Sequence, residues 1–174
     1  MTIEKTSQVS TEDEHSLAGK YLTFRLGKEE YGIEILRVRE IIGLMDITPV
    51  PRSPEHIRGV INLRGRIIPV LDLRMKFEME AFEASEESCI IVLDVTFEGV
   101  LTHMGVLVDG VCEVLDIASE EIDPPPILSA GSSTQFLLGM AKSRGTVKIL
   151  LNAERIISGG EADAVGESLT TPSS

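Results

Sequence analysis

The hydrophobic pattern of the chain predicts short β-strands separated by turns. Apolar and polar residues alternate over residues 21–26, which indicates a strand with its apolar side chains on one face. A turn at 27–30 and a returning strand at 31–35 would complete a hairpin. Residues 36–42 are rich in Ile and Val with charges between them, so they could continue the second strand. The chain therefore begins its ordered part as β-structure.

More strands are predicted on both sides of an acidic connection. They are expected at 59–63, 67–73, 88–97, 104–115, 137–141 and 147–151. Pro69 lacks a backbone N–H, which suggests that its strand lies at an edge or contains a bulge. The connection, residues 78–88, holds five Glu, and residues 116–138 form a long loop. A short helix is expected at 152–157, so the fold class is all-β with few short helices.

An internal repeat is visible in the apolar pattern. Residues 31–42 match 104–115, where a Gly, a Val and a Glu coincide. Residues 59–71 match 139–151, and an Arg-Gly turn occurs in both copies. The two matches follow in the same order, which favours duplication over chance. We interpret them as two similar small all-β units, and units of this size suit small closed barrels.

Length and composition bound the class of protein. The 174 residues correspond to about one domain, and a hydrophobic share of 43% is enough for a packed core. No apolar run approaches the roughly 18 residues that span a bilayer. Residues 1–19 are acidic and have no apolar stretch, which is not typical of a signal peptide. We therefore expect a cytoplasmic protein.

Charge is distributed unevenly along the chain. The net charge is −12, yet residues 20–77 hold eleven basic and seven acidic residues. Residues 78–174 hold four basic and seventeen acidic ones. This predicts an electrically lopsided molecule, which favours oriented docking to partners. Nucleic-acid binding is not expected, because the basic stretch carries its own acids and the rest would repel phosphate.

Catalytic and metal-binding motifs are not found in the sequence. Cys89 and Cys112 form no CxxC and lie in apolar stretches, so we interpret both as reduced, buried thiols. The three histidines have no metal-ligand spacing, and no GxSxG, GxGxxG or P-loop pattern occurs. The sequence therefore predicts no enzyme activity, no cofactor and no metal site.

A few residues are candidates for a binding surface. Arg64 lies at a predicted turn, where its guanidinium could pair with a carboxylate as a fork. Glu40 lies in an apolar strand and is either on the solvent face or paired, for instance with Arg64. Pattern alone favours a core position over an interface position for Val38, Val111 and Val114.

Three strings give the chain a resemblance to a known family. YGIEILRVREI begins at Tyr31, GVINLRG begins at Gly59 and IPVLDLR begins at Ile68. Together they resemble the CheW family of bacterial chemotaxis coupling proteins over residues 20–157. The resemblance implies two five-stranded SH3-like β-barrels packed around an apolar groove. It also implies a non-enzymatic adaptor between the hairpin tips of chemoreceptors and the regulatory domain of the histidine kinase CheA, itself a similar double barrel.

The resemblance also implies which residues bind. The receptor-side candidates are Val38, Glu40, Gly59, Arg64, Ile90, Gly105, Val111 and Val114. Asp123 and Leu128 lie where the family contacts the kinase, although Asp123 replaces a base that occurs in some members. The hairpin around 97–102 is longer than in some members.

The expected domain organisation follows from these features. Residues 1–19 form a flexible acidic arm, and residues 158–174 form a disordered tail. The first barrel would cover about 20–77 and the second about 88–157, with 78–88 as the connection. We expect a chain that is monomeric alone and assembled in receptor arrays at the membrane, without inserting into it.

Three other functions compete with this one. The chain could serve a related pathway that is not chemotactic, such as surface motility or biofilm signalling. It could be a regulatory barrel from a kinase, although no catalytic domain is present. It could also be an undetected enzyme, which would require a deep polar pocket with perturbed titratable groups.

Overall fold

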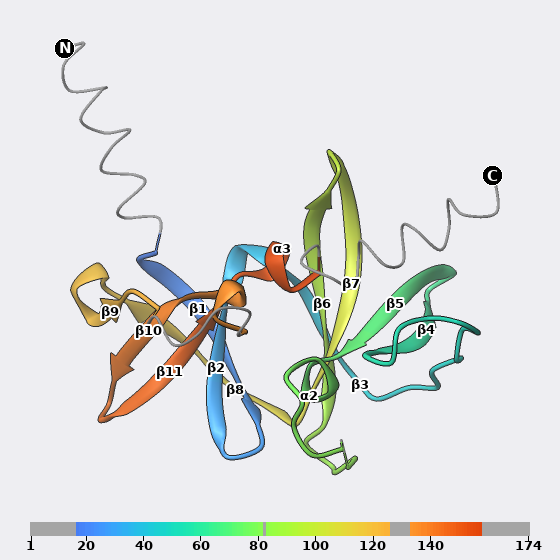
Figure 1. The fold of residues 1–174 in the computed structure, drawn as a ribbon, viewed down its shortest axis with the longest axis horizontal. Coiled ribbons are helices and arrows are strands. Elements are labelled where there is room, and N and C mark those ends of the chain that lie inside the picture. The colour runs from blue at the N-terminus through green and yellow to red at the C-terminus, as the bar shows by residue number, and fades with distance from the viewer. Residues whose placement is uncertain (1–16, 82, 126–132, 158–174) are drawn as a thin grey trace.

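The computed structural model describes residues 17–81, 83–125 and 133–157, and its strands form two sheets (Figure 1). Sheet A has the order β8 (Gly110–Ile117), β1 (Gly19–Leu26), β2 (Glu29–Glu34), β11 (Thr146–Leu151), β10 (Leu137–Ser143) and β9 (Ile122–Asp123). Sheet B has the order β3 (Val38–Gly43), β6 (Cys89–Phe97), β7 (Val100–Val108), β5 (Arg66–Asp72) and β4 (Ile57–Leu63). The all-β fold class is confirmed.

Helical structure is limited to short turns at the joints between strands. The α-helices are α2 (Leu73–Lys76) and α3 (Ala153–Ile156), and the 3-10 turns are η1 (Ile35–Arg37), η2 (Ser119–Glu121) and η3 (Ser133–Phe136). Asp72 caps α2 by accepting hydrogen bonds from two backbone amides, and Asn152 caps α3 in the same way from one amide. These caps occupy matching positions in the two repeats.

Each sheet closes on itself. In sheet B the chain after β3 reaches the far edge, where Thr48 and Val60 exchange two backbone hydrogen bonds of 2.8 and 2.9 Å. In sheet A the chain leaves β8 through η2 and enters β9, which pairs with β10. Closure leaves few unpaired edges. We call the two closed sheets barrel A and barrel B.

The barrels do not follow the sequential division predicted from the sequence. Barrel B contains β3 to β7, whereas barrel A combines the first hairpin, β1–β2, with β8 to β11. The repeat is present, but its copies exchange hairpins. The strand after each hairpin crosses over and pairs with the other hairpin, so that β3 pairs with β6 and β8 pairs with β1. Sheet A also has six strands instead of five, because β9 is a short strand where sheet B has only the Thr48 bridge.

This exchange also changes the distribution of charge. The basic segment 20–77 contributes β1 and β2 to barrel A and β3 to β5 to barrel B. The charge asymmetry along the sequence is therefore not an asymmetry between the barrels.

Strand continuity differs from the prediction at three places. The strand predicted at 104–115 is two strands, because β7 ends at Val108 in sheet B and β8 begins at Gly110 in sheet A. Residues 36–42 do not continue the second strand, because η1 intervenes and β3 joins the other sheet. Pro69 lies in β5, a central strand of sheet B and not an edge, and the pairing of β4 with β5 has a register shift beside it, between Ile57 and Gly59. It is tolerated because the parallel pairing of β5 with β7 begins only at Val70, so no partner needs the missing N–H.

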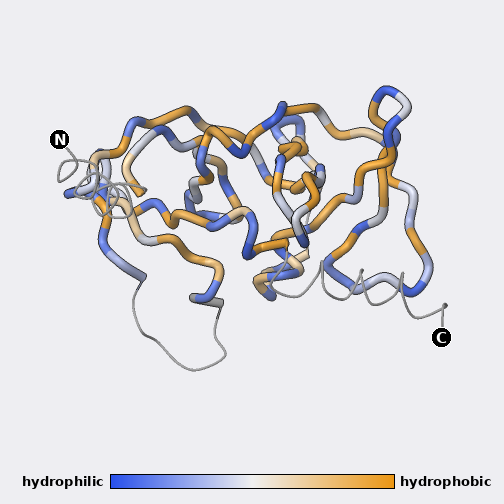
Figure 2. Tube along the Cα trace, turned by 90° about the horizontal axis from the view of Figure 1, so that it is seen from above, coloured by the Kyte–Doolittle hydropathy of each residue, from blue (hydrophilic) through white to orange (hydrophobic). Residues whose placement is uncertain are grey.

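Three clusters of buried side chains make up the core. One lies inside barrel B, around Ile61 and Ile90, and one lies inside barrel A, around Tyr21 and Leu150. The third and largest draws residues from both sheets and from α3, so it fills the space between the barrels. Figure 2 shows apolar segments running along the strands of the whole molecule. We call the third cluster the interbarrel core.

Strand β1 shows how one segment serves two clusters. Leu22, Phe24 and Leu26, the face predicted by alternation, lie in the interbarrel core. Tyr21 points to the other side and lies inside barrel A. A row of aromatic rings continues the interbarrel core, from Phe24 through Tyr31 (centroids 6.0 Å apart) and then to Phe77 and Phe136. Burial on both faces fixes the strand register.

A first ion pair holds the crossover between β7 and β8. Asp109 accepts hydrogen bonds from Arg74 Nη2 at 2.6 Å and Arg74 Nε at 3.1 Å, and from the backbone N–H of Gly27 at 2.6 Å. Burial tends to raise the pKa of Asp109, but these hydrogen bonds outweigh it and hold the pKa below its ordinary value. The pair joins α2 to the crossover and to the turn of the β1–β2 hairpin.

A second ion pair holds the other crossover with the charges reversed. Glu154 Oε2 on α3 accepts hydrogen bonds from Arg37 Nη1 in η1 and from the backbone N–H of Thr96, both at 3.2 Å. Here the helix carries the acid and the crossover carries the base. The helix residues Arg74 and Glu154 are equivalent in the two repeats, whereas Asp109 and Arg37 lie one position apart in the aligned crossovers. The two repeats therefore fasten the exchanged hairpins with ion pairs in which the acid and the base have exchanged places.

We predict that Arg74→Ala lowers the free energy of unfolding by about 1–3 kcal/mol, because half-buried Asp109 loses its charged donor. The pKa of Asp109 is lowered in the folded state, so its stabilisation is present above the unfolded pKa of about 3.9 and is lost as pH falls through the folded value. The difference between wild type and variant should therefore shrink below about pH 4. Urea unfolding across pH measures it. Lys142→Ala, which breaks an exposed pair, should change stability little at any pH.

Candidate partner-binding surface

Arg64 is held at the tip of the β4–β5 turn. Arg64 and Gly65 both have positive φ, 54° and 87°, as a two-residue type I′ hairpin turn requires. The Asn62 side chain accepts a hydrogen bond of 2.8 Å from the Gly65 N–H and so stabilises the turn. The guanidinium binds Glu40 on β3 through two hydrogen bonds of 2.8 Å, from Nη1 and from Nη2. The pairing of Glu40 with Arg64, one of two alternatives left by the sequence, is the one that the structure forms.

The pair combines a fixed geometry with solvent access. The side chain of Arg64 is 69% exposed and that of Glu40 is 26% exposed. The hydrogen bond from Arg64 lowers the pKa of Glu40, so the carboxylate stays charged. A guanidinium has five N–H donors, and the bidentate pair uses two of them. Arg64 can therefore hold Glu40 and still donate to a partner's carboxylate or carbonyl.

Barrel A carries a second pair of the same kind. Arg144 and Gly145 form the β10–β11 turn with φ values of 55° and 81°. Arg144 Nη1 donates to both carboxylate oxygens of Glu113 on β8, at 3.1 and 3.0 Å. Neither residue was among the candidates from the sequence. The internal repeat contained the signal, since it aligns Glu113 with Glu40 and Arg144 with Arg64.

Exposed aliphatic side chains accompany both pairs. In barrel B, Ile41 follows Glu40 and Ile67 follows the Arg64 turn, and they are 44% and 65% exposed. In barrel A, Val114 follows Glu113 and Val147 follows the Arg144 turn, and they are 48% and 49% exposed. Each barrel thus has a fixed arginine, a residue type enriched at protein interfaces, and exposed aliphatic side chains close to that pair in the sequence.

The valine candidates lie at two depths. Val38 on β3 and Val111 on β8 are half-buried and pack against the interbarrel core. They occupy equivalent places in the two repeats, Val38 at the first and Val111 at the second position of the strand that crosses between barrels. Val114 is exposed on β8. The structure therefore brings part of the candidate set to the junction of the barrels, whereas the groove expected there remains a prediction.

Three other candidates lie inside barrel B. Ile90 has an exposed fraction of 0%, and a Cβ on Gly105 would lie 2.8 Å from Ile90 Cγ2. Gly59 has a φ of 144°, and a Cβ there would overlap the carbonyl oxygen of Thr48. These residues have no surface with which to touch a partner. They permit close packing and barrel closure, so any effect on binding would act through the fold.

Barrel A repeats both glycine positions. A Cβ on Gly139 would lie 2.7 Å from the backbone oxygen of Asp123, at the equivalent closure point. A Cβ on Gly32 would lie 2.9 Å from Leu150 Cδ2. Glycine is thus needed at these sites for the architecture itself.

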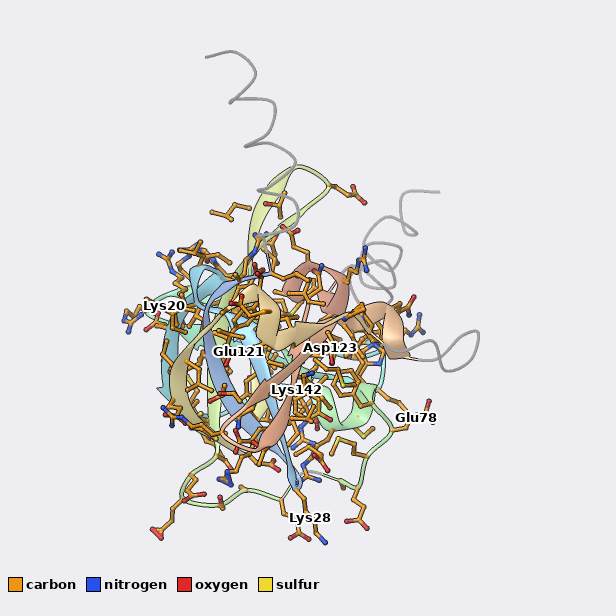
Figure 3. The ribbon with its side chains drawn as sticks, turned by 90° about the vertical axis from the view of Figure 1, so that its left-hand side faces the viewer. Lys20, Lys28, Glu78, Glu121, Asp123 and Lys142 are labelled. Carbon is orange, nitrogen blue, oxygen red and sulfur yellow. The ribbon has the colours of Figure 1, made fainter. Side chains whose placement is uncertain are left out.

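The kinase-side candidates are only partly described. Asp123 lies on β9, exposed, with its carboxylate 3.1 Å from Lys142 Nζ on β10. Figure 3 shows the two side chains on the face of barrel A, with Glu121 nearby. Leu128 lies outside the described residues. The ion pair with Lys142 thus balances the charge of Asp123 within the chain. An acid at this position therefore changes the charge of the surface less than an unpaired acid would.

Little in the described part of the chain points to chemistry at a reactive group. Among residues 17–81, 83–125 and 133–157, no group of three or more His, Cys, Asp and Glu residues could hold a metal ion. Cys89 is buried, as expected, and burial raises the pKa of its thiol. The expectation for Cys112 was wrong: it is exposed, because β8 turns that face of barrel A to solvent. No helix in the described ranges is long and apolar enough to span a membrane.

The double barrel carries two exposed Arg–Glu pairs and several exposed aliphatic residues, features that suit a protein-interaction module. Comparison with known proteins gives its family. The model of the CheW-like domain matches residues 20–161. The chain belongs to the CheW family, and it is a coupling and scaffold protein of chemotaxis.

Individual relatives agree with this assignment. The chemotaxis protein CheW of Klebsiella aerogenes is 39% identical over 142 residues, which cover 82% of this chain and 83% of the relative. Protein FrzA of Myxococcus xanthus is 30% identical over 148 residues, 84% of this chain and 89% of the relative. The crystal structure of the scaffolding protein TtCheW from Thermoanaerobacter tengcongensis superimposes with a TM-score of 0.72 at 35% identity, covering 83% of this chain and 90% of that one.

We predict that Gly59→Ala lowers the free energy of unfolding by about 2 kcal/mol or more, because the new Cβ meets Thr48 where barrel B closes. Chemical denaturation measures the loss. Gly43→Ala is the matched control on β3, because nothing lies within 4 Å of its added Cβ. Equal stability of the two variants would contradict the closure role.

We predict that Arg64→Ala raises the pKa of Glu40 toward its ordinary value, because the hydrogen bonds that favour the carboxylate are lost. An NMR titration of the Glu side-chain carboxyl carbons measures this. Arg144→Ala, which removes the equivalent arginine of barrel A, should leave the pKa of Glu40 unchanged. No response of Glu40 to Arg64→Ala would show that the pair does not persist in solution.

Proposed function

We propose that the protein is a non-enzymatic adaptor that couples chemoreceptors to the histidine kinase CheA. The observation that carries this proposal is the presence of two equivalent Arg–Glu faces on one molecule. A protein that links two partners needs two separate surfaces, so that both partners can be bound at the same time. The chain offers such a surface on each barrel, fixed relative to the other by the interbarrel core.

The receptor-side surface would lie along the crossover strands. Val38 and Glu40 on β3, and Val111 and Val114 on β8, come from different barrels. We propose that a helical receptor tip docks here with its apolar side chains against the valines. Arg64 would supply a charged contact at the rim, and a contact of this kind contributes mostly to specificity and orientation.

The kinase-side surface would lie on barrel A near β9. Asp123 and Lys142 together offer one acceptor and one donor there, and Leu128 would add an apolar contact. Since the resemblance makes the kinase's regulatory domain a similar double barrel, the Arg144–Glu113 face is a second candidate for that contact. Substitutions at Asp123 and at Arg144 would separate the two possibilities.

Coupling in this proposal is mechanical. A receptor shift would move the whole scaffold, because the interbarrel core and the two crossover ion pairs join the barrels into one packed unit. Contacts at the kinase would then change. This amounts to allostery only if binding at one face alters affinity at the other, and single contacts could be weak because an array supplies many of them.

We predict that Arg64→Glu weakens binding to a chemoreceptor cytoplasmic fragment by about tenfold or more while the chain stays folded, because like charges then face each other at the pair. Titration calorimetry measures affinity, and circular dichroism checks the fold. The charge-swapped double variant Arg64→Glu with Glu40→Arg restores the local pair. Recovery by the swap would mean that the pair only shapes the turn, whereas continued loss would mean that Arg64 itself meets the partner. Unchanged affinity for both receptor and kinase would refute the proposal for this face.

A related pathway is the second candidate. The similarity to protein FrzA shows that the family extends beyond relatives named CheW. Neighbouring genes and binding tests with receptors of each pathway would distinguish chemotaxis from surface motility or biofilm signalling. Localisation in the cytoplasm with recruitment to receptor arrays is part of the same proposal, and a fluorescent fusion that stays dispersed in cells with arrays would argue against it.

A further inference from the structure

The β6–β7 hairpin extends beyond the rest of sheet B. Strand β3 pairs with β6 only as far as Leu93, and β5 pairs with β7 only from Gly105 onward. The segment 94–104 between these limits is a two-stranded ribbon. Its base contributes Val95 and Met104 to the interbarrel core, and its tip projects away from both barrels in Figure 1. The hairpin of barrel A has no such extension, because β11 already pairs with β2 at Glu30.

The register shows which backbone groups face outward from this ribbon. Phe97 pairs with Val100 across the two-residue turn, so the backbone groups of these two residues are hydrogen-bonded to each other. Along the ribbon, every second pair of opposite residues is hydrogen-bonded in the same way. The N–H and C=O groups of Leu101 and His103 therefore point away from β6. On the opposite edge, the outward N–H of Thr96 donates to Glu154. One edge is thus covered by α3, and no strand of the described chain pairs with the other.

The open edge lacks the features that usually prevent strand pairing. Edge strands are commonly protected by charged side chains, proline or a bulge. Residues 100–104 contain no Asp, Glu, Lys, Arg or Pro, and their register with β6 has no shift. The ring of His103 lies against Asp94, 2.6 Å away on the neighbouring strand. Val100 and Leu101 are each 63% exposed.

We propose that this edge binds the same edge of a second copy of the chain, as an antiparallel pair about a two-fold axis at Leu101. Leu101 would then face Leu101 of the other copy, and Val100 would face Thr102. No like charges would lie opposite each other in this register, which is the condition for a self-complementary interface. Because the ribbon projects beyond the barrels, two copies meet tip to tip.

The proposed contact is small, so it would form only where copies of the chain are concentrated. Two apolar side chains and a few backbone hydrogen bonds per copy do not offset the loss of free motion in dilute solution. The chain would stay monomeric there and pair where copies are concentrated, as on a shared array. The inference goes beyond the coupling function, since it concerns contacts between scaffolds and involves neither receptor nor kinase.

Disulfide trapping tests the proposal with the chain alone. Leu101→Cys is made in a Cys112→Ser background, and the matched control is Thr96→Cys, the residue directly across the ribbon on the covered edge. Backbones in such a pair approach to a distance that a disulfide can bridge. We expect about fivefold more dimer from Leu101→Cys than from Thr96→Cys under mild oxidation at high protein concentration. Equal yields from the two positions, or no dimer from Leu101→Cys, would overturn the proposal.

Competition separates specific pairing from random collision. An excess of the Cys112→Ser chain without the new cysteine should reduce the Leu101→Cys dimer, because it occupies the same edge. A competitor chain that carries both Cys112→Ser and Val100→Lys should reduce the yield of the Leu101→Cys dimer much less, since a charge beside the two-fold axis opposes strand pairing. Equal competition by both chains would also overturn the proposal. Neither readout depends on receptor or kinase binding, so failure here is distinct from failure of the coupling function.

Discussion

The exchange of hairpins between the two repeats is the constraint on which the rest of the structure depends. Each barrel is completed by strands from the other repeat, so neither repeat can close a barrel by itself. The exchange requires two crossovers, and these bring Leu22, Phe24, Ile91 and Leu93 into one interbarrel core. Burial of this apolar surface is the main force that holds the barrels together. The crossover ion pairs then fix the geometry.

Both candidate faces follow from barrel closure. Glu40 and Arg64 are far apart along the chain, and they meet because the Thr48 bridge brings the segment after β3 against β4. Glu113 and Arg144 meet in the same way through η2 and β9. The glycines at 59 and 139 permit these closures. The same architecture therefore makes two similar surfaces, which is what an adaptor between two partners requires.

Duplicated architecture does not produce identical barrels. The crossover carries the acid in one ion pair and the base in the other. In addition, only barrel B has a hairpin that extends beyond its neighbouring strands. Under the proposed coupling function, differences of this kind would let the two surfaces discriminate between partners even where the Arg–Glu pairs match. They are also the places where this chain departs most from a simple repeat.

The sequence by itself determined most of the strands, the turns, the repeat and the family, because these depend on local alternation, on glycine at positive φ and on motif strings such as the one around Arg64. It also allowed the pairing of Glu40 with Arg64 as one of two alternatives. Only the tertiary structure decided that the repeats exchange hairpins, that Ile90 is fully buried and that Cys112 is exposed. Apolar alternation shows that a strand has a buried face but does not show which sheet buries it, and that choice is made by contacts between residues distant in the chain.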